Sequence, residues 1–295
     1  MAHAAKREGG ALMTWLSETG RRTGRRVLQY VVAYGFTAVW LIPFIGLLVT
    51  SVSPFREVIR GWWNVQLANI SLENYATAWN HPTAPIAEGV ANSLVVTFPA
   101  TIVPIVLGAM AAYGFLRYRF PARNTLFFII VLLLAIPQYT IAVPLFQMLA
   151  DFGLINTFAG LILMHSAWGA PWVILFMRGY FSTLPKEVEE SAELDGAGPL
   201  TVFFRVVVPM SWPGLASVFA LQFTWVWNDF FFALIAIYDH SMMLATQRIP
   251  LMRGEFQVDW GVLTSAAILT TIIPLAVYML LQKYYVKGFI GFSSK

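Results

Sequence analysis

Long uncharged stretches constrain this 295-residue sequence more than any other feature. Each is longer than the roughly 20 residues that an α-helix needs to cross about 30 Å of hydrocarbon. The alternating pattern that marks the strands of an outer-membrane barrel does not occur. Across the chain 58% of the residues are hydrophobic and 12% are charged, whereas soluble domains carry about 25% charged residues. We therefore predict an all-α membrane protein with six transmembrane helices, formed by residues 27–55, 89–116, 124–150, 152–177, 206–228 and 260–282.

The basic residues predict how these helices are oriented. Six crossings place both termini on one side of the membrane, and of the 19 Lys and Arg residues only Arg56, Arg60, Arg248 and Arg253 then fall on the other side. Because basic residues concentrate in the cytoplasmic loops of membrane proteins, we expect both termini to be cytoplasmic. This topology explains the net charge of +4 without any affinity for nucleic acid.

The same topology divides the chain into parts with different surroundings. We expect a transmembrane core that follows one separate helix and its external loop, with a cytoplasmic helix inserted into the core. The predicted parts are a basic cytoplasmic tail at 1–26, the first transmembrane helix at 27–55, an external loop at 56–88, the core at 89–285 with its cytoplasmic helix at about 184–198, and a cytoplasmic tail at 286–295.

Catalytic and metal-binding patterns are missing from the sequence. There is no cysteine, the four histidines lie in unrelated segments without metal-ligand spacing, and no nucleophile motif such as GxSxG occurs. The phosphate-binding motif GxxxxGK[ST] is also absent, so the chain cannot hydrolyse ATP by itself. We therefore expect neither an enzyme nor a metal site nor a cofactor in this chain.

One predicted cytoplasmic segment, 184–209, is strongly acidic and holds five of the fifteen Asp and Glu residues. Pro185 lies where a helix would begin, acidic residues follow in the first turn, and Gly196 ends the pattern. Val188, Ala192 and Gly196 recur at every fourth position, so a stripe of small side chains runs beside the carboxylates. This surface suits the close approach of a partner, but a loop helix lying on its own bundle would show the same pattern.

The same segment carries an ordered motif. Glu190, Ser191 and Ala192 are followed by Gly196 four residues later and by Pro209 thirteen residues after that glycine. This arrangement resembles the EAA-x3-G-x9-I-x-L-P motif of permease subunits in ABC importers, and the spacing matches at every position. The departures are Ser191 in place of the usual alanine and valine in place of the isoleucine and leucine that precede the proline.

Other segments are similar to the carbohydrate branch of that family, and in particular to the second permease subunit of maltose-type importers. The resemblance covers roughly residues 27–290, although the ending 288–295 departs from the family's usual glycine- and alanine-rich ending. The matching segments are 92–94, 113–121, 136–137, 153–157, 181–185 and 227–230.

The resemblance implies a complex in the cytoplasmic membrane of a bacterium or an archaeon. Its implied partners are a second homologous permease subunit, two ATP-binding subunits that hold ATP and Mg, an external substrate-binding protein and the lipid bilayer. In such complexes the helix with the EAA motif docks in a cleft of an ATP-binding subunit. Glu190 would pair with a basic residue there, Ala192 would pack into the cleft, and Gly196 would permit the turn. The implied coupling residues are Glu190, Ser191, Ala192, Asp195, Gly196 and Pro209.

Asp229, at the outer end of the fifth predicted crossing, marks a second candidate site. A charge near the centre of a bilayer costs roughly 2.5–3.5 kcal/mol on insertion scales. Asp229 follows Trp225, Trp227 and Asn228, and this mixture of aromatic faces and hydrogen-bonding groups suits a carbohydrate path. Two structural alternatives stay open, namely an interfacial aromatic group with a solvated carboxylate and a hydrogen bond between helices. Weaker candidates, expected to be satisfied polar groups in the bundle, are Gln138, Gln147, His165 and Gln222.

The sequence therefore predicts a permease subunit that supplies half of the pathway of an ATP-driven sugar importer. Its external segment 239–259 would face the binding protein, with a solvated connector as the alternative. An ABC permease for a non-carbohydrate solute would carry the same EAA motif, and an ion-coupled secondary transporter would use Asp229 as a cation or proton site. The identity of the solute does not follow from the sequence.

Overall fold

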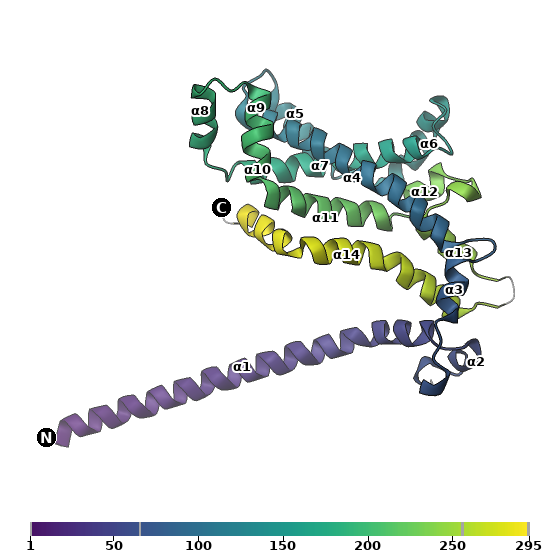
Figure 1. Cartoon of the computed structure of the whole chain (residues 1–295). Coiled ribbons are helices and arrows are strands. Elements are labelled where there is room, and N and C mark those ends of the chain that lie inside the picture. Colours follow the sequence, from purple (N-terminus) through teal and green to yellow (C-terminus); the bar gives the residue numbers. More distant parts are fainter. Residues whose placement is uncertain (1, 65, 255–256, 294–295) are drawn as a thin grey trace.

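A computed structural model describes residues 2–64, 66–254 and 257–293, and all the regular structure in these ranges is helical (Figure 1). Within these ranges, four helices contain stretches that are long and apolar enough to cross a membrane. They are α1 (Ala2–Ser51), α4 (Ile86–Arg117), α7 (Phe158–Phe181) and α14 (Trp260–Ser293).

Two bent pairs of helices supply the remaining crossings. The first joins α5 (Arg123–Leu133) to the segment Gln138–Asp151, which contains η3 (Gln138–Ile141) and α6 (Ala142–Asp151), at a bend of 96°. The second joins the segment Pro199–Met210 to α11 (Trp212–Asn228) at a bend of 78°. Counting each bent pair as one span gives six crossings and confirms the predicted all-α membrane fold.

Short helices connect these spans or form the segment Pro199–Met210 of the second bent pair. Two of them, α8 and α13, lie near opposite ends of the bundle (Figure 1). The short elements are α2 (Phe55–Val58), η1 (Trp62–Asn64), η2 (Leu67–Asn69), α3 (Glu73–Trp79), α8 (Lys186–Leu194), α9 (Pro199–Val202), the π-helical turn η4 (Phe203–Val207), α10 (Val208–Met210), α12 (Phe231–Ala236), η5 (His240–Met242) and α13 (Ala245–Leu251).

Prolines lie at both bends, but a proline inside a helix does not always bend it. Pro137 has an extended backbone at the first bend, and it has no N–H to continue the helical hydrogen-bond ladder. At the second bend Pro209 and Pro213 flank Ser211, whose hydroxyl donates to the Val207 carbonyl at 2.7 Å. In contrast, α7 continues through Pro171, so that proline does not break its span.

The core of the bundle is built from α4, α7, α11 and α14. Helix α4 packs along α7, and α11 packs between α4 and α14. The α8 end is filled by a cluster around Tyr113, Phe181 and Phe203, and two further clusters around Trp227 and Phe232 fill the rest. Most of this interior is apolar, which the long uncharged runs predict.

Helix α1 extends away from this bundle (Figure 1). Its described apolar side chains are largely exposed, and Phe36 for example is 72% exposed. Contact with the bundle is made at the C-terminal end, where the Ser51 carbonyl accepts hydrogen bonds from Ser265 Oγ at 3.1 Å and Asn74 Nδ2 at 3.0 Å. The helix is continuous from Ala2, so no break separates the predicted tail at 1–26 from the first crossing.

Candidate functional site

Helix α8 carries the motif singled out in the sequence, and it lies at the same end of the molecule as the described C-terminal part of α14 (Figure 1). Pro185 caps its N-terminus, and Glu187 and Glu189 occupy the first turn, where negative charge stabilises a helix. The helix ends at Leu194, and Gly196 then adopts a φ of +86°. Glycine is favoured in this left-handed conformation because a Cβ atom would be strained there.

The predicted coupling residues do not share one environment. Glu190, Ser191, Asp195 and Gly196 are exposed, so a partner could reach all four. Ala192 is half-buried and packs against the chain's own core cluster at the α8 end, although it was expected to fill a partner's cleft. Pro209, which is also exposed, lies in α10 at the 78° bend.

Glu190 forms an ion pair with Lys186 one turn earlier on α8. This hydrogen bond, supported by the carboxylate charge, raises the pKa of Lys186 above its ordinary value. Both side chains remain more than half exposed, and exposed pairs of this kind exchange easily with water and with other charges. The carboxylate of Glu190 is therefore free to take a different cationic partner.

Two features of α8 are absent from the sequence prediction. Leu194 is 89% exposed, and it follows Glu190 by one helical turn. Residues one turn apart share a side of a helix, so a partner could contact the Glu190 carboxylate and this apolar side chain together. Glu189, by contrast, is buried and forms an ion pair with Arg117 at the end of α4. The acidic run of α8 offered no signal that one of its carboxylates faces the bundle.

The second candidate site is a cavity of about 740 Å³ beside the end of α11. Trp225, Asn228 and Asp229, three of the four predicted path residues, line it together with side chains from η3 and α12. The wall thus mixes aromatic faces with amide, hydroxyl and carboxylate groups. The other lining residues are Gln138, Tyr139, Leu221, Thr224, Phe230, Phe231 and Leu234.

Trp227, the fourth predicted path residue, lies in the core instead of the cavity wall. It is 1% exposed, its indole N–H donates to the Thr270 carbonyl at 3.0 Å, and its ring stacks on Phe223 with centroids 5.8 Å apart. The ring stacking lies within α11, and the hydrogen bond joins α11 to α14. Trp227 therefore has a packing role that its position in the aromatic sequence cluster did not reveal.

Asp229 is 9% exposed, and its hydrogen bonds connect the C-terminal end of α11 to η3, α12 and α13. Its carboxylate accepts hydrogen bonds from the Phe232 N–H at 2.8 Å and from Gln138 Nε2 at 3.2 Å. His165 Nε2 in α7 lies 3.7 Å from the same carboxylate, beyond hydrogen-bond distance. Thr246 donates its hydroxyl to the Asp229 carbonyl at 3.0 Å. The hydrogen-bonding alternative therefore describes this residue, and the solvated carboxylate does not.

The two remaining weaker candidates, Gln222 and Gln147, lie in different environments. Gln222 is 1% exposed, and it accepts the indole N–H of Trp172 at 2.7 Å and donates to the Ala100 carbonyl at 3.5 Å. It therefore links α7, α11 and α4 inside the core, as expected for a satisfied polar group. Gln147 is exposed on α6, so it is not the satisfied bundle group that the sequence predicts.

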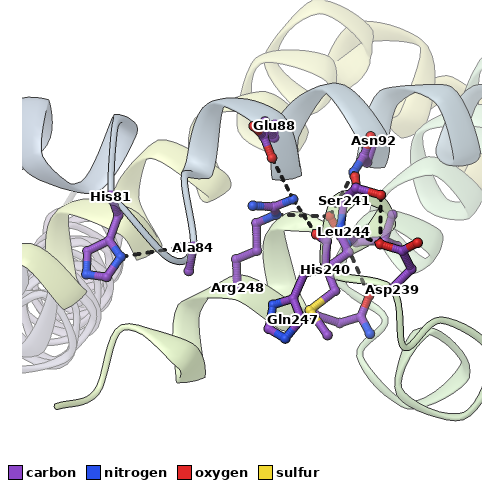
Figure 2. Close-up of polar contacts among 11 residues, drawn as sticks. His81, Ala84, Glu88, Asn92, Asp239, His240, Ser241, Leu244, Gln247 and Arg248 are labelled. Carbon is purple, nitrogen blue, oxygen red and sulfur yellow. Dashed lines mark hydrogen bonds and ion pairs between the residues drawn. The ribbon is translucent and has the colours of Figure 1, made fainter.

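Residues 239–248, which follow α12, are held against the start of α4 (Figure 2). Arg248 is 2% exposed, and its guanidinium donates to the His240 carbonyl at 2.7 Å, to the Met243 carbonyl at 3.2 Å and to Glu88 Oε2 at 3.0 Å. Asn92 Nδ2 donates to the Met243 carbonyl at 3.1 Å. These contacts hold residues 239–248 against α4, whereas several described residues between 250 and 257 are exposed.

These features define a class of protein, namely a helical membrane subunit with a protruding acidic helix at one end and a fixed polar segment at the other. Residues 104–291 match the family model described as "Binding-protein-dependent transport system inner membrane component", and the chain belongs to this family. It is thus an integral membrane protein and an ABC transporter permease. Family membership decides against the ion-coupled alternative.

Particular relatives extend the likeness to nearly the whole chain. A probable ABC transporter permease protein of Pyrococcus horikoshii is 51% identical over 91% of this chain and 98% of its own length. The diacetylchitobiose uptake system permease protein NgcG of Streptomyces coelicolor is 32% identical over 84% of this chain and 82% of its own. A chain in the crystal structure of a bacterial ABC transporter for alginate import has the same fold, with a TM-score of 0.77, 21% identity and coverage of 88% and 95%.

Proposed function

We propose that this chain is one of two permease subunits in an importer that takes up a carbohydrate at the expense of ATP hydrolysed by partner subunits. The observation that carries the proposal is α8, which exposes Glu190 and the apolar Leu194 next to each other beyond the apolar bundle. A helix with this exposed surface is suited to a protein partner and not to lipid. The chain lacks the phosphate-binding motif, so ATP and Mg would be bound by that partner.

The proposal assigns a side of the membrane to each end of the bundle. With α8 in the cytoplasm, the segment 239–248 faces the exterior, where a substrate-binding protein would dock. The basic residues favour this orientation, because those near α8 outnumber those near α13. Both termini would then be cytoplasmic.

A second permease subunit would complete the pathway. Helix α1 has apolar side chains that this chain leaves uncovered, and the cavity beside α11 is open. Docking of a similar subunit over these surfaces would enclose a path between the two chains. Closure of the ATP-binding subunits would draw the two α8 helices together and turn the path outward, and hydrolysis would reset it inward.

A carbohydrate is favoured by the composition of the cavity and by the family. Sugars stack their C–H faces on aromatic rings and form hydrogen bonds through their hydroxyl groups. Trp225 is 41% exposed and Tyr139 is 73% exposed in this wall, with Asn228 beside them. Since a relative over most of the chain is a diacetylchitobiose uptake permease, a mono- or oligosaccharide is the proposed substrate.

The test begins with purification of the tagged chain from native membranes in a mild detergent, followed by mass spectrometry. A second permease and an ATP-binding subunit should copurify, and proteoliposomes with the binding protein should take up a saccharide only when ATP is present. Recovery of this chain alone, with uptake driven by an ion gradient, would contradict the proposal.

A matched pair of variants tests the cavity. Trp225→Ala should raise the KM for saccharide uptake, while Trp212→Ala, on the same helix but at its other end and 56% exposed, should leave it unchanged. Equal KM values for both variants would remove Trp225 from the path.

A further inference from the structure

Two neighbouring glutamates on α8 face in opposite directions. The side chain of Glu190 is 53% exposed, whereas that of Glu189 is 5% exposed. Glu190 is ion-paired with Lys186 on its own helix, but Glu189 reaches across to α4. The buried carboxylate is thus committed to the bundle, and the exposed one remains available to a partner.

Glu189 is held by three donor groups. Arg117 Nε lies 3.0 and 3.1 Å from the two carboxylate oxygens, and Arg117 Nη2 also donates to one of them. The hydroxyl of Tyr113 donates to the other oxygen at 3.0 Å. A guanidinium that holds both oxygens fixes the plane of the carboxylate as well as its position. Because Tyr113 and Arg117 are one turn apart on α4, the contact also restrains rotation of α8 against that helix.

Burial makes this contact much more durable than the pair on the outer face of α8. A buried charge that loses its partner is left uncompensated in a medium of low dielectric constant, so a buried pair rarely opens. An exposed pair such as Lys186 with Glu190 is easily replaced by water. When a partner moves α8, the contact of Glu189 with α4 should therefore persist.

Helix α4 extends this connection to the other end of the molecule (Figure 1). Its 32 residues span about 48 Å at 1.5 Å per residue, and the helix is continuous. Near its start, Glu88 and Asn92 bind the segment 239–248 (Figure 2). Among the described residues, α4 is therefore ion-paired to α8 at one end and to Arg248 of that segment at the other.

We infer that Glu189, Arg117 and Tyr113 form a joint through which movement of α8 is transmitted to α4 and along it to the segment 239–248. The three are positioning residues, and Glu190 is the docking residue on the same helix. This inference rests on the proposed function, in which an ATP-binding subunit moves α8. Docking and transmission are then assigned to adjacent residues, which makes them separable by mutation.

The experiment uses the complete complex in proteoliposomes and measures saccharide uptake per ATP hydrolysed. Glu189→Gln and Arg117→Gln should each copurify with the ATP-binding subunits as the wild type does, yet lower uptake per ATP at least tenfold. Tyr113→Phe removes one hydrogen bond and no charge, so it should lower the ratio by about two- to fivefold. Glu187→Gln, an exposed acidic residue in the same turn, is the matched control and should leave the ratio unchanged.

Two further results separate transmission from a purely structural role. The exchanged pair Glu189→Arg with Arg117→Glu should recover part of the lost uptake per ATP, since it restores an ion pair between the helices. The melting temperature of Tyr113→Phe should stay within a few degrees of the wild type while its uptake ratio falls. If the yield of Glu189→Gln is too low for the assay, the uptake per ATP of Tyr113→Phe tests the inference by itself.

Failure of this inference is distinguishable from failure of the proposed function. Normal uptake per ATP in assembled complexes of Glu189→Gln, or of Tyr113→Phe where that variant decides, would overturn the joint while leaving the importer intact. A fall in melting temperature with an unchanged uptake ratio would likewise make the contact structural only. Absence of ATP-binding subunits from the wild-type preparation would overturn the proposed function itself.

Discussion

Replacement of Arg248 by methionine isolates what fixes the segment 239–248 (Figure 2). Methionine keeps the aliphatic bulk of the buried side chain but removes the guanidinium donors to the His240 and Met243 carbonyls and to Glu88. A hydrogen bond to a charged group contributes about 1.5–3 kcal/mol. The His240 carbonyl and Glu88 lose the Arg248 donor, whereas the Met243 carbonyl keeps the donor from Asn92. We therefore expect the segment to lose about 3–4 kcal/mol of stabilisation in total.

This loss should appear in hydrogen–deuterium exchange of the segment. About 3–4 kcal/mol corresponds to roughly 10²- to 10³-fold faster exchange at the amides of α13, if they exchange by local opening. The amide of Ala245, which donates to Ser93 Oγ at 3.0 Å, is the most direct reporter. Exchange in α7 should stay unchanged, because Arg248 does not contact it in the described structure.

Glu88→Gln is the matched control for this prediction. The Glu88 side chain is 61% exposed, so its ion pair with Arg248 contributes at most about 1 kcal/mol. The two backbone carbonyls keep their donor in this variant, and exchange should rise less than tenfold. If Glu88→Gln accelerates exchange as much as Arg248→Met, the ion pair and not the carbonyl contacts fixes the segment, and the reasoning is refuted.

Three further predictions follow from other parts of the molecule. Glu190→Arg should release the ATP-binding subunits or uncouple ATP hydrolysis from uptake, while membrane insertion stays normal. Glu187→Arg, at another exposed position, is the control. Normal copurification and full uptake by Glu190→Arg would show that Glu190 is not part of the docking surface. Trp227→Ala should destabilise the bundle by about 3–5 kcal/mol, because it opens a cavity between α11 and α14, and a melting temperature equal to that of the wild type would contradict its core placement. Hydrogen bonds from the Ser241 side chain and backbone lower the pKa of Asp239. Their stabilising effect on the turn is therefore present above the ordinary carboxyl pKa and is lost as the pH falls through the lowered pKa. Hydrogen exchange of the Ser241 amide should rise only in that acidic range, and Asp239→Asn should abolish this pH dependence.

The position of α8 illustrates how far local sequence determines structure. Pro185 and the acidic first turn predicted its start, and Gly196 predicted its end, because capping and left-handed backbone preferences depend on the residue itself. The helix observed at Lys186–Leu194 lies within the predicted range of 184–198. Which carboxylate faces inward was not predictable, since Glu187, Glu189 and Glu190 have identical side chains.

The prediction at the second site was limited for a related reason. Trp225 and Trp227 are two residues apart in one helix, so they point to different sides of it. The sequence grouped them by composition, but only the packing of α14 decides that Trp227 is in the core and Trp225 in the cavity wall. Likewise, Gln138 and Asp229 are 91 residues apart, and no local pattern indicates that they form a hydrogen bond.

The sequence by itself determined the class of fold and the family. A run of 20 or more uncharged residues can satisfy its backbone in lipid only as a helix, so six such runs sufficed for the number of crossings. The EAA-like spacing sufficed for the resemblance. Tertiary structure alone decided where the spans bend, which polar side chains meet and which glutamate of α8 is tied to α4. Those outcomes depend on contacts between distant segments, whose geometry is set by the packing of whole helices and not by any one residue's preference.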